Sequence, residues 1–335
     1  MLLRSAYSYL YRMKFRTEIE IRPYDRQLSY DDRLLALGSC FATEIGRRLA
    51  EAKFRIAVNP SGVLFNPLSV VRALRRYHNE RPVAKEELQQ ADGRWFHYDF
   101  HGSLSGATPD EALTRINTAV AEGTRALREA SVVLLTLGTA WVYERTDTGD
   151  AVANCHKQPA DRFRRRRLTV EEIVSEIENA LSAELSGKQI LLTVSPVRHL
   201  GDGLTGNTVS KAVLRLAAEE LTERHAQIAY FPAYEILCDD LRDYRFYADD
   251  LVHPSSQAVA YIWKHFCEAL LTPDARHLLP RIAEVTAAAR HRPLHPTAEA
   301  YRAFCRRQLE VIDRLPEADF TEETAFFRRQ IEINS

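Results

Sequence analysis

Two segments that lie far apart in the 335-residue sequence contain residue types suited to nucleophilic catalysis. Ser39 follows Gly38 at the end of a short apolar run and precedes an amphipathic segment. We therefore expect Ser39 at a sharp turn from a strand into a helix, where the helix N-terminus stabilises negative charge. Asp250 and His253 lie three residues apart in a predicted loop, and a histidine can accept a hydroxyl proton while a carboxylate fixes its tautomer. Each segment is a weak signal alone, because N-cap serines and loop histidines are common, but together they match the Ser/His/Asp pattern.

Five short apolar runs predict the strands that would position these residues. They are rich in Leu, Val and Ile, which suits strands buried on both faces, and they lie at residues 33–38, 54–58, 131–137, 189–194 and 227–231. Amphipathic segments with helix-capping residues separate them. This alternation predicts a parallel sheet with helices on both faces. Because ligands bind beyond the carboxyl ends of the strands in such sheets, we expect the chemistry at that edge.

The character of the chain changes after about residue 272. Residues 276–335 have helical patterns and no strand pattern. We therefore expect an α/β domain over residues 14–272 and a helical extension over residues 273–335. This extension either packs on the domain or serves in dimerisation, which would make the protein a homo-oligomer.

Residues 38–42 read GSCFA, and the sequence resembles the GSCFA family from about residue 14 to residue 272. Further blocks follow in order: NPSG at 59–62, FNPL at 65–68, LGTAW at 137–141, NCHK at 154–157, SPVRH at 195–199, YRFY at 244–247 and DLVHPS at 250–255. The family is placed with the SGNH (GDSL-like) hydrolases. The resemblance implies a three-layer α/β/α fold with a five-stranded parallel sheet, similar to that of flavodoxin.

The resemblance also implies a role for each residue of the candidate site. Ser39 matches the nucleophile of SGNH enzymes, His253 matches the general base and Asp250 matches the carboxylate that orients it. The backbone N–H groups at Ser39 and Gly62 match two donors of the oxyanion hole. Cys40 is an alternative nucleophile, since a helix N-terminus lowers a thiol pKa, but the family geometry implies that its side chain turns inward.

One block departs from the SGNH pattern. The third block of those enzymes reads Gly-x-Asn-Asp, and its asparagine completes the oxyanion hole, whereas residues 138–141 read GTAW. Losing one oxyanion donor typically costs roughly 3–4 kcal/mol of transition-state stabilisation. Thr139, Asn66, Asn154 and His156 are candidates to fill the place. We favour Asn154 or His156, because both are polar and follow the third strand closely.

Polar residues near the predicted strand ends are candidates for substrate binding. Arg198 and His199 follow the fourth strand and are suited to an anionic or polyhydroxyl group, although capping and surface salt bridges explain them equally well. His101 belongs to an aromatic-rich segment that we expect at the pocket mouth, where a ring can stack on a sugar. Asn66 and His156 complete this set.

Composition argues against several partners. The 45 Lys and Arg residues are balanced by 46 Asp and Glu, for a net charge of −1, so we expect no nucleic-acid partner and a solvated loop for the arginine run at residues 162–167. No stretch reaches the roughly 18 apolar residues of a membrane helix. Five scattered cysteines with no C-x-x-C pair indicate a reducing compartment. We expect a cytoplasmic protein that needs no metal or other cofactor and no membrane.

Two hypotheses about function follow. The first is a serine esterase or O-acyltransferase that acts on an acyl ester, in particular an acetyl ester, of a small molecule or carbohydrate through an acyl-serine. The alternative is a non-catalytic binding or assembly module that keeps the SGNH scaffold with an incomplete oxyanion hole.

Overall fold

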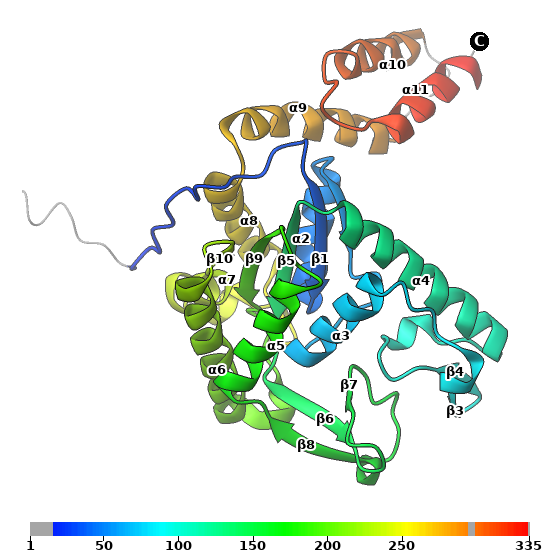
Figure 1. The fold of residues 1–335 in the computed structure, drawn as a ribbon. Coiled ribbons are helices and arrows are strands. Elements are labelled where there is room, and N and C mark those ends of the chain that lie inside the picture. The colour runs from blue at the N-terminus through cyan, green and yellow to red at the C-terminus, as the bar shows by residue number, and fades with distance from the viewer. Residues whose placement is uncertain (1–15, 294–298, 334–335) are drawn as a thin grey trace, which may run out of the picture.

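A five-stranded parallel sheet lies at the centre of the computed structural model, which describes residues 16–293 and 299–333 (Figure 1). The strand order is β10-β9-β5-β1-β2, and all neighbours are parallel. The strands are β1 (Arg33–Gly38), β2 (Arg55–Val58), β5 (Val132–Leu137), β9 (Gln189–Val194) and β10 (Ile228–Tyr230). Each lies within a predicted apolar run, so the predicted sheet is confirmed.

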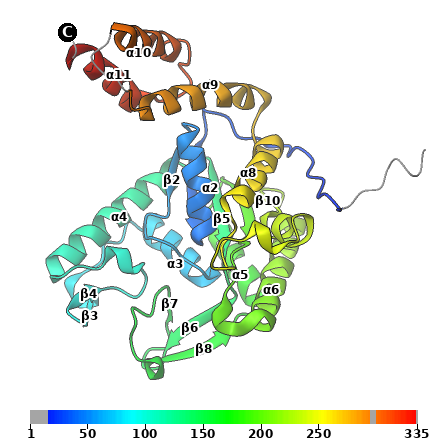
Figure 2. The ribbon, with the colours of Figure 1, turned by 180° about the vertical axis from the view of Figure 1, so that it is seen from behind.

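Helices cover both faces of the sheet and complete the predicted three-layer fold. Side chains alternate along β1: Leu34 and Ala36 face a core shared with α2 and α8, whereas Leu35 and Leu37 face a core shared with α3, α5 and α6. Figure 1 shows the second face, and Figure 2 shows α2 and α8 from behind. These helices, with α4, are α2 (Cys40–Glu51), α3 (Pro67–His78), α4 (Pro109–Glu129), α5 (Val170–Ser182), α6 (Gly203–Arg224) and α8 (Ser256–Leu270).

Smaller elements occupy the loops. Two antiparallel sheets consist of β3 (Gln89–Ala91) with β4 (Arg94–Phe96), and of β6 (Trp141–Arg145) between β7 (Ala151–Val152) and β8 (Phe163–Arg167). Short helical segments are η1 (Lys85–Glu87), η2 (Gly102–Leu104), η3 (Ala160–Arg162), η4 (Leu200–Asp202), α7 (Ala233–Glu235), the π-helical η5 (Ile236–Asp240) and η6 (Tyr244–Phe246).

The arginine run, expected as a solvated loop, forms β8 instead, and that prediction is wrong. Arg164 and Arg166 both bind the buried carboxylate of Glu144 on β6, at 2.6 Å each. The guanidinium of Arg165 lies 4.3 Å from the centre of the Trp141 ring. The arginine side chains of β8 therefore bind residues of the neighbouring strand β6, and these contacts allow such a polar segment to form part of a sheet.

Among the described residues, three helices follow the sheet domain, as expected of a helical extension: α9 (Pro273–Arg290), α10 (Glu299–Ile312) and α11 (Thr321–Ile333). Lys53, directly after α2, pairs with Glu323 of α11 at 2.6 Å. Both figures place these helices at the end of the molecule opposite the β6–β8 sheet. Among the described helices, none combines the length and the apolar composition that crossing a bilayer requires.

Candidate active site

Ser39 lies in the predicted turn between β1 and α2. It is the N-cap of α2, and its Oγ accepts a hydrogen bond from the Phe41 N–H at 3.3 Å. Gly38 makes the turn possible, since its φ is +134° and a Cβ there would lie 2.1 Å from the carbonyl oxygen of Thr136. Ser39 is only 1% exposed. The residue therefore stands at the expected place in the fold, with its side chain buried.

Asn59 holds this turn in place from the end of β2. Its Oδ1 accepts the Gly38 N–H at 2.8 Å, and its Nδ2 donates to Thr43 Oγ1 on α2 at 2.9 Å. Sequence reasoning assigned Asn59 no role of its own, because its two partners are distant in the sequence. The NPSG block that contains it was the available signal.

Asp250 and His253 form the pair that their spacing predicts. Asp250 Oδ2 lies 2.7 Å from His253 Nδ1, and Asp250 Oδ1 accepts the backbone N–H groups of His253 and Val252 at 2.9 Å each. These hydrogen bonds, with that of the His253 backbone first, lower the pKa of Asp250 to about 2. The carboxylate is therefore charged at neutral pH, holds a proton on Nδ1 and leaves Nε2 of His253 as the acceptor.

The structure brings Ser39 and the Asp250–His253 pair to the same end of the sheet. Arg198, which follows β9, donates its backbone N–H to the carbonyl of Val252 at 3.2 Å and so ties the His253 loop to the end of β9. Within the described residues, no hydrogen bond joins Ser39 Oγ to His253 Nε2. Catalytic hydrogen bonds are often long before substrate binds, so a proton transfer from Ser39 to His253 would require the two side chains to approach.

The two backbone donors implied for the oxyanion hole are engaged in this structure. The Ser39 N–H donates to the Thr136 carbonyl at 3.1 Å, and the Gly62 N–H donates to the Asn59 carbonyl at 2.8 Å. The N–H of Cys40, the first residue of α2, interacts with the Cys40 thiol, and it lies at the positive end of the helix dipole. The oxyanion roles of Ser39 and Gly62 stay predictions.

Cys40 differs from Ser39 in exposure and in chemistry. Its side chain is partly exposed, rather than turned fully inward. Burial nevertheless raises the pKa of the Cys40 thiol, so the thiol stays protonated at neutral pH. This argues against Cys40 as the nucleophile.

The hydroxyl of Thr139, one candidate to replace the missing asparagine, is engaged elsewhere. Its Oγ1 lies 3.0 Å from Ser210 Oγ on α6 and accepts the Trp141 N–H at 3.1 Å. These contacts fix the turn between β5 and β6.

Asn154 and His156 contact each other and the β4 region. Asn154 Oδ1 accepts the His156 N–H at 2.7 Å. The His156 ring stacks on Phe96 at 4.2 Å, and its Nε2 lies 3.1 Å from the carbonyl of His97. Burial lowers the pKa of His156 to about 4. These contacts account for both residues as parts of the loop structure.

Asn66 is better placed for an oxyanion donor than Asn154 or His156. Its Oδ1 caps α3 by accepting the Ser69 N–H at 2.9 Å, whereas its Nδ2 has no partner among the residues that the structure describes. The preceding carbonyl, of Phe65, accepts the Gly138 N–H at 2.8 Å. A Cβ on Gly138 would lie 3.2 Å from Ser39 Cβ. Asn66 therefore directly follows Phe65, whose carbonyl binds Gly138, and Gly138 adjoins Ser39.

His101 packs against the turn that contains Gly62. A Cβ on Gly62 would lie 2.2 Å from His101 Cβ, and the φ of Gly62 is +77°, so glycine is required there on both grounds. The His101 backbone N–H donates to the Ser61 carbonyl at 3.0 Å, and its Nδ1 accepts the Ser103 N–H at 3.2 Å. Its expected contact with substrate stays a prediction.

Arg198 and His199 lie beside the His253 loop. Arg198 donates to the carbonyl of Leu251 at 3.3 Å, and its guanidinium lies 3.8 Å from the Tyr247 ring centre. Burial, followed by the charge of Lys211 and by His253, lowers the pKa of His199 to about 4. His199 is therefore neutral at physiological pH and does not attract an anion by charge.

A cavity of about 440 Å³ collects several of the expected residues. Asn66, Thr139, Asn154, Arg198 and His199 line it, whereas Ser39, His253, His101 and His156 do not. Its other walls include Phe65, Trp141, Tyr143, Arg165 and Leu200, to which sequence reasoning assigned no role. Their signal was weak, because Trp141, Tyr143 and Arg165 lie on the short strands β6 and β8, which sequence reasoning did not predict.

Comparison with known protein families shows which family this chain belongs to. The GSCFA family model matches residues 33–266, and the model of the GSCFA domain protein C-terminal domain matches residues 282–333. The chain belongs to the GSCFA family. No curated protein and no solved structure matches it.

In this GSCFA protein, a buried lysine joins two strand ends beside Ser39. Lys211 of α6 is 1% exposed, and its Nζ donates to the carbonyls of Gly138 at 2.6 Å and Ser195 at 2.7 Å. Burial lowers its pKa to about 7. Lys211 thereby fixes the loops after β5 and β9 relative to each other.

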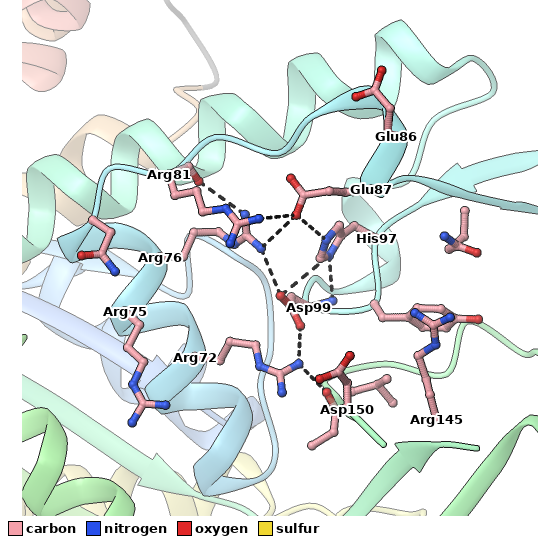
Figure 3. Close-up of a pocket in the computed structure, with 15 residues that line it drawn as sticks. Arg72, Arg75, Arg76, Arg81, Glu86, Glu87, His97, Asp99, Arg145 and Asp150 are labelled. Atoms are coloured by element: carbon pink, nitrogen blue, oxygen red, sulfur yellow. Dashed lines mark hydrogen bonds and ion pairs between the residues drawn. The ribbon is translucent and has the colours of Figure 1, made fainter. Parts of the chain in front are cut away.

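The GSCFA protein also has a larger cavity, of about 640 Å³, lined by five arginines from α3, the η1 region and β6 (Figure 3). Asp99 binds Arg72 at 2.9 Å and Arg76 at 3.2 Å. The other three also have carboxylate partners: Arg75 with Glu176, Arg81 with Glu87 and Arg145 with Asp147. We assign this cavity to structural ion pairs.

No group of three or more His, Cys, Asp or Glu side chains in residues 16–293 and 299–333 is arranged to hold a metal ion.

Proposed function

We propose that this GSCFA protein is a serine esterase or O-acyltransferase of the SGNH type. The observation that supports it best is the Asp250–His253 pair, with 2.7 Å between carboxylate and imidazole, at the end of the sheet where Ser39 caps α2. The carboxylate holds His253 in the tautomer that can accept a proton.

In the proposed reaction, Ser39 Oγ attacks the acyl carbonyl while His253 Nε2 takes its proton. The tetrahedral oxyanion is held by N–H donors at the start of α2, with Asn66 Nδ2 as the candidate side-chain donor. Collapse of this intermediate breaks the ester bond, and His253 returns the proton to the leaving alcohol. Water or a second alcohol then attacks the acyl-serine through the same proton transfers and frees Ser39.

The proposed substrate is an acyl ester of a small molecule or carbohydrate, and an acetyl ester is the simplest representative. We place the reaction in the cytoplasm, because the five cysteines are free thiols and fit a reducing compartment.

The test uses purified full-length protein with p-nitrophenyl acetate and an active-site phosphonate. We expect turnover and a covalent adduct on Ser39, both lost in Ser39→Ala and both kept in Cys40→Ala. An intact fold with neither turnover nor adduct would refute the proposal. An adduct on Cys40 would show that Cys40, and not Ser39, is the nucleophile.

A binding or assembly module is the alternative. It is favoured by one observation: the N–H groups of Ser39 and Gly62 are engaged, and Ser39 is not hydrogen-bonded to His253 within the described residues. In that case the phosphonate would label neither the wild type nor the Ser39→Ala variant.

A further inference from the structure

Exposed apolar side chains gather at the mouth of the candidate site. Of the seven large apolar side chains that are exposed in the described residues, five lie between the carboxyl end of β5, β9 or β10 and the first turn of the next long helix, whereas Val209 and Leu216 lie further along α6. We call these five the apolar rim: Tyr143, Leu200, Leu204, Tyr244 and Leu251, with exposures between 42% and 60%. Exposed apolar side chains that cluster in this way mark interaction sites.

Contacts join the rim to the site. Arg198 donates to the Leu251 carbonyl at 3.3 Å, and its guanidinium lies 5.3 Å from the Tyr244 ring centre. Leu200 follows two residues later and, with Tyr143, lines the 440 Å³ cavity beside the Ser39 loop. The rim therefore continues from the His253 loop to the cavity wall.

Leu251 is held in an unfavourable conformation between Asp250 and His253. Its φ is +57°, a region that favours glycine or asparagine. The Leu251 N–H donates to the Ala248 carbonyl at 2.9 Å, which helps to hold this turn. Because Leu251 is 49% exposed, packing within the protein does not account for an apolar side chain here.

We infer that the apolar rim binds the acyl chain of the ester substrate and favours longer chains over acetyl. This inference rests on the proposed esterase function and names its substrate class. Two tyrosine rings and a backbone carbonyl contact the guanidinium of Arg198 and orient it, and the rim side chains supply the apolar surface beside it. A methylene that leaves water completely favours binding about fourfold, and a half-exposed rim is expected to give about twofold.

The experiment compares p-nitrophenyl acetate, butyrate, hexanoate and octanoate with the full-length protein. We expect kcat/KM to rise about twofold per methylene, hence roughly 30- to 100-fold from acetate to octanoate. Leu251→Asn, which suits the positive φ, and Leu204→Gln should each reduce this octanoate-to-acetate ratio at least threefold. Leu216→Gln is the matched control, since Leu216 is 60% exposed on the same helix as Leu204, roughly 18 Å further along it.

Failure of this inference is distinguishable from failure of the proposed function. Hydrolysis of acetate with a flat or falling chain-length profile, or equal effects of Leu204→Gln and Leu216→Gln, would overturn the inference and leave the esterase. No hydrolysis of any ester and no Ser39 adduct would overturn the esterase itself. If Leu204→Gln instead dissociates a dimer in light scattering, the rim is an interface between two copies and the acyl assignment is wrong.

Discussion

Asn66 is a residue whose two polar atoms have separable tasks. Its oxygen caps α3, and its amide nitrogen has no partner in the described residues. An Asn66→Asp substitution keeps a good capping oxygen but removes the N–H donor and places negative charge near a developing oxyanion. We expect kcat/KM for p-nitrophenyl acetate to fall roughly 10²- to 10³-fold, with the free energy of unfolding in urea changed by less than about 0.5 kcal/mol.

The control for this prediction is Asn66→Ala, which removes the cap as well and should lower both activity and stability. Wild-type activity in Asn66→Asp would show that another group holds the oxyanion.

At this scale, sequence reasoning succeeded where the signal is local. Ser39 follows its strand directly, and Asp250 and His253 are three residues apart, so their segments predict the turn and the hydrogen-bonded pair that the structure contains. The contacts of Asn59 and Lys211 were not predicted, because their partners lie 16 to 73 residues away, and Lys211 was considered only as a possible substrate-binding residue. Such contacts depend on the fold rather than on spacing.

At the scale of elements, Lys211 connects α6 to the loops after β5 and β9. A Lys211→Met substitution leaves the carbonyls of Gly138 and Ser195 buried without their donor. We expect the free energy of unfolding to fall by about 2–4 kcal/mol, measured by urea denaturation. Lys264→Met, at an exposed lysine of α8, is the control and should change it by less than about 0.5 kcal/mol. Equal stability of the two variants would contradict the role assigned to Lys211.

Asp99 connects α3 to the loop after β4 and makes this connection depend on pH. Burial alone would raise its pKa, but the charges of Arg72 and Arg76 outweigh burial and lower it. A carboxylate with a lowered pKa stabilises the folded state above the unfolded value, near 3.9, and this contribution is lost as the pH falls through the folded pKa. We expect Asp99→Asn to cost roughly 2–3 kcal/mol at pH 7 and clearly less at pH 3, by urea denaturation. A difference that grows toward acid pH would contradict this.

The elements themselves were predicted as far as their side chains show periodicity. β1, β5 and β9 are rich in Leu, Val and Ile that are buried on both faces, and the edge strands β2 and β10 are shorter and partly buried, but each of the five was found from its composition. β8 was missed because its arginines have no apolar alternation, and their pairing with Glu144 and Trp141 arises only when β6 lies alongside.

At the scale of the whole molecule, the C-terminal helices dock on the sheet domain through a buried ion pair. Glu323 is 8% exposed and binds Lys53 at 2.6 Å, and Lys53 lies 5.5 Å from the Phe320 ring centre. Glu323→Gln leaves the lysine charge without its partner, so we expect α10 and α11 to be cleaved by trypsin about 5- to 30-fold faster, corresponding to about 1–2 kcal/mol of local stability. The neighbouring exposed Glu322→Gln is the control, and an equal rate in both variants would count against this docking contact.

The position of α11 has a practical consequence for handling the protein. It lies at the end of the molecule away from the β6–β8 sheet and the loops beyond the central strands (Figure 1). An affinity handle fused after α11 and captured on a sensor chip or bead would therefore turn the mouth of the cavity toward free solution. Immobilised in this orientation, the protein exposes its apolar rim to any compound supplied in the flow.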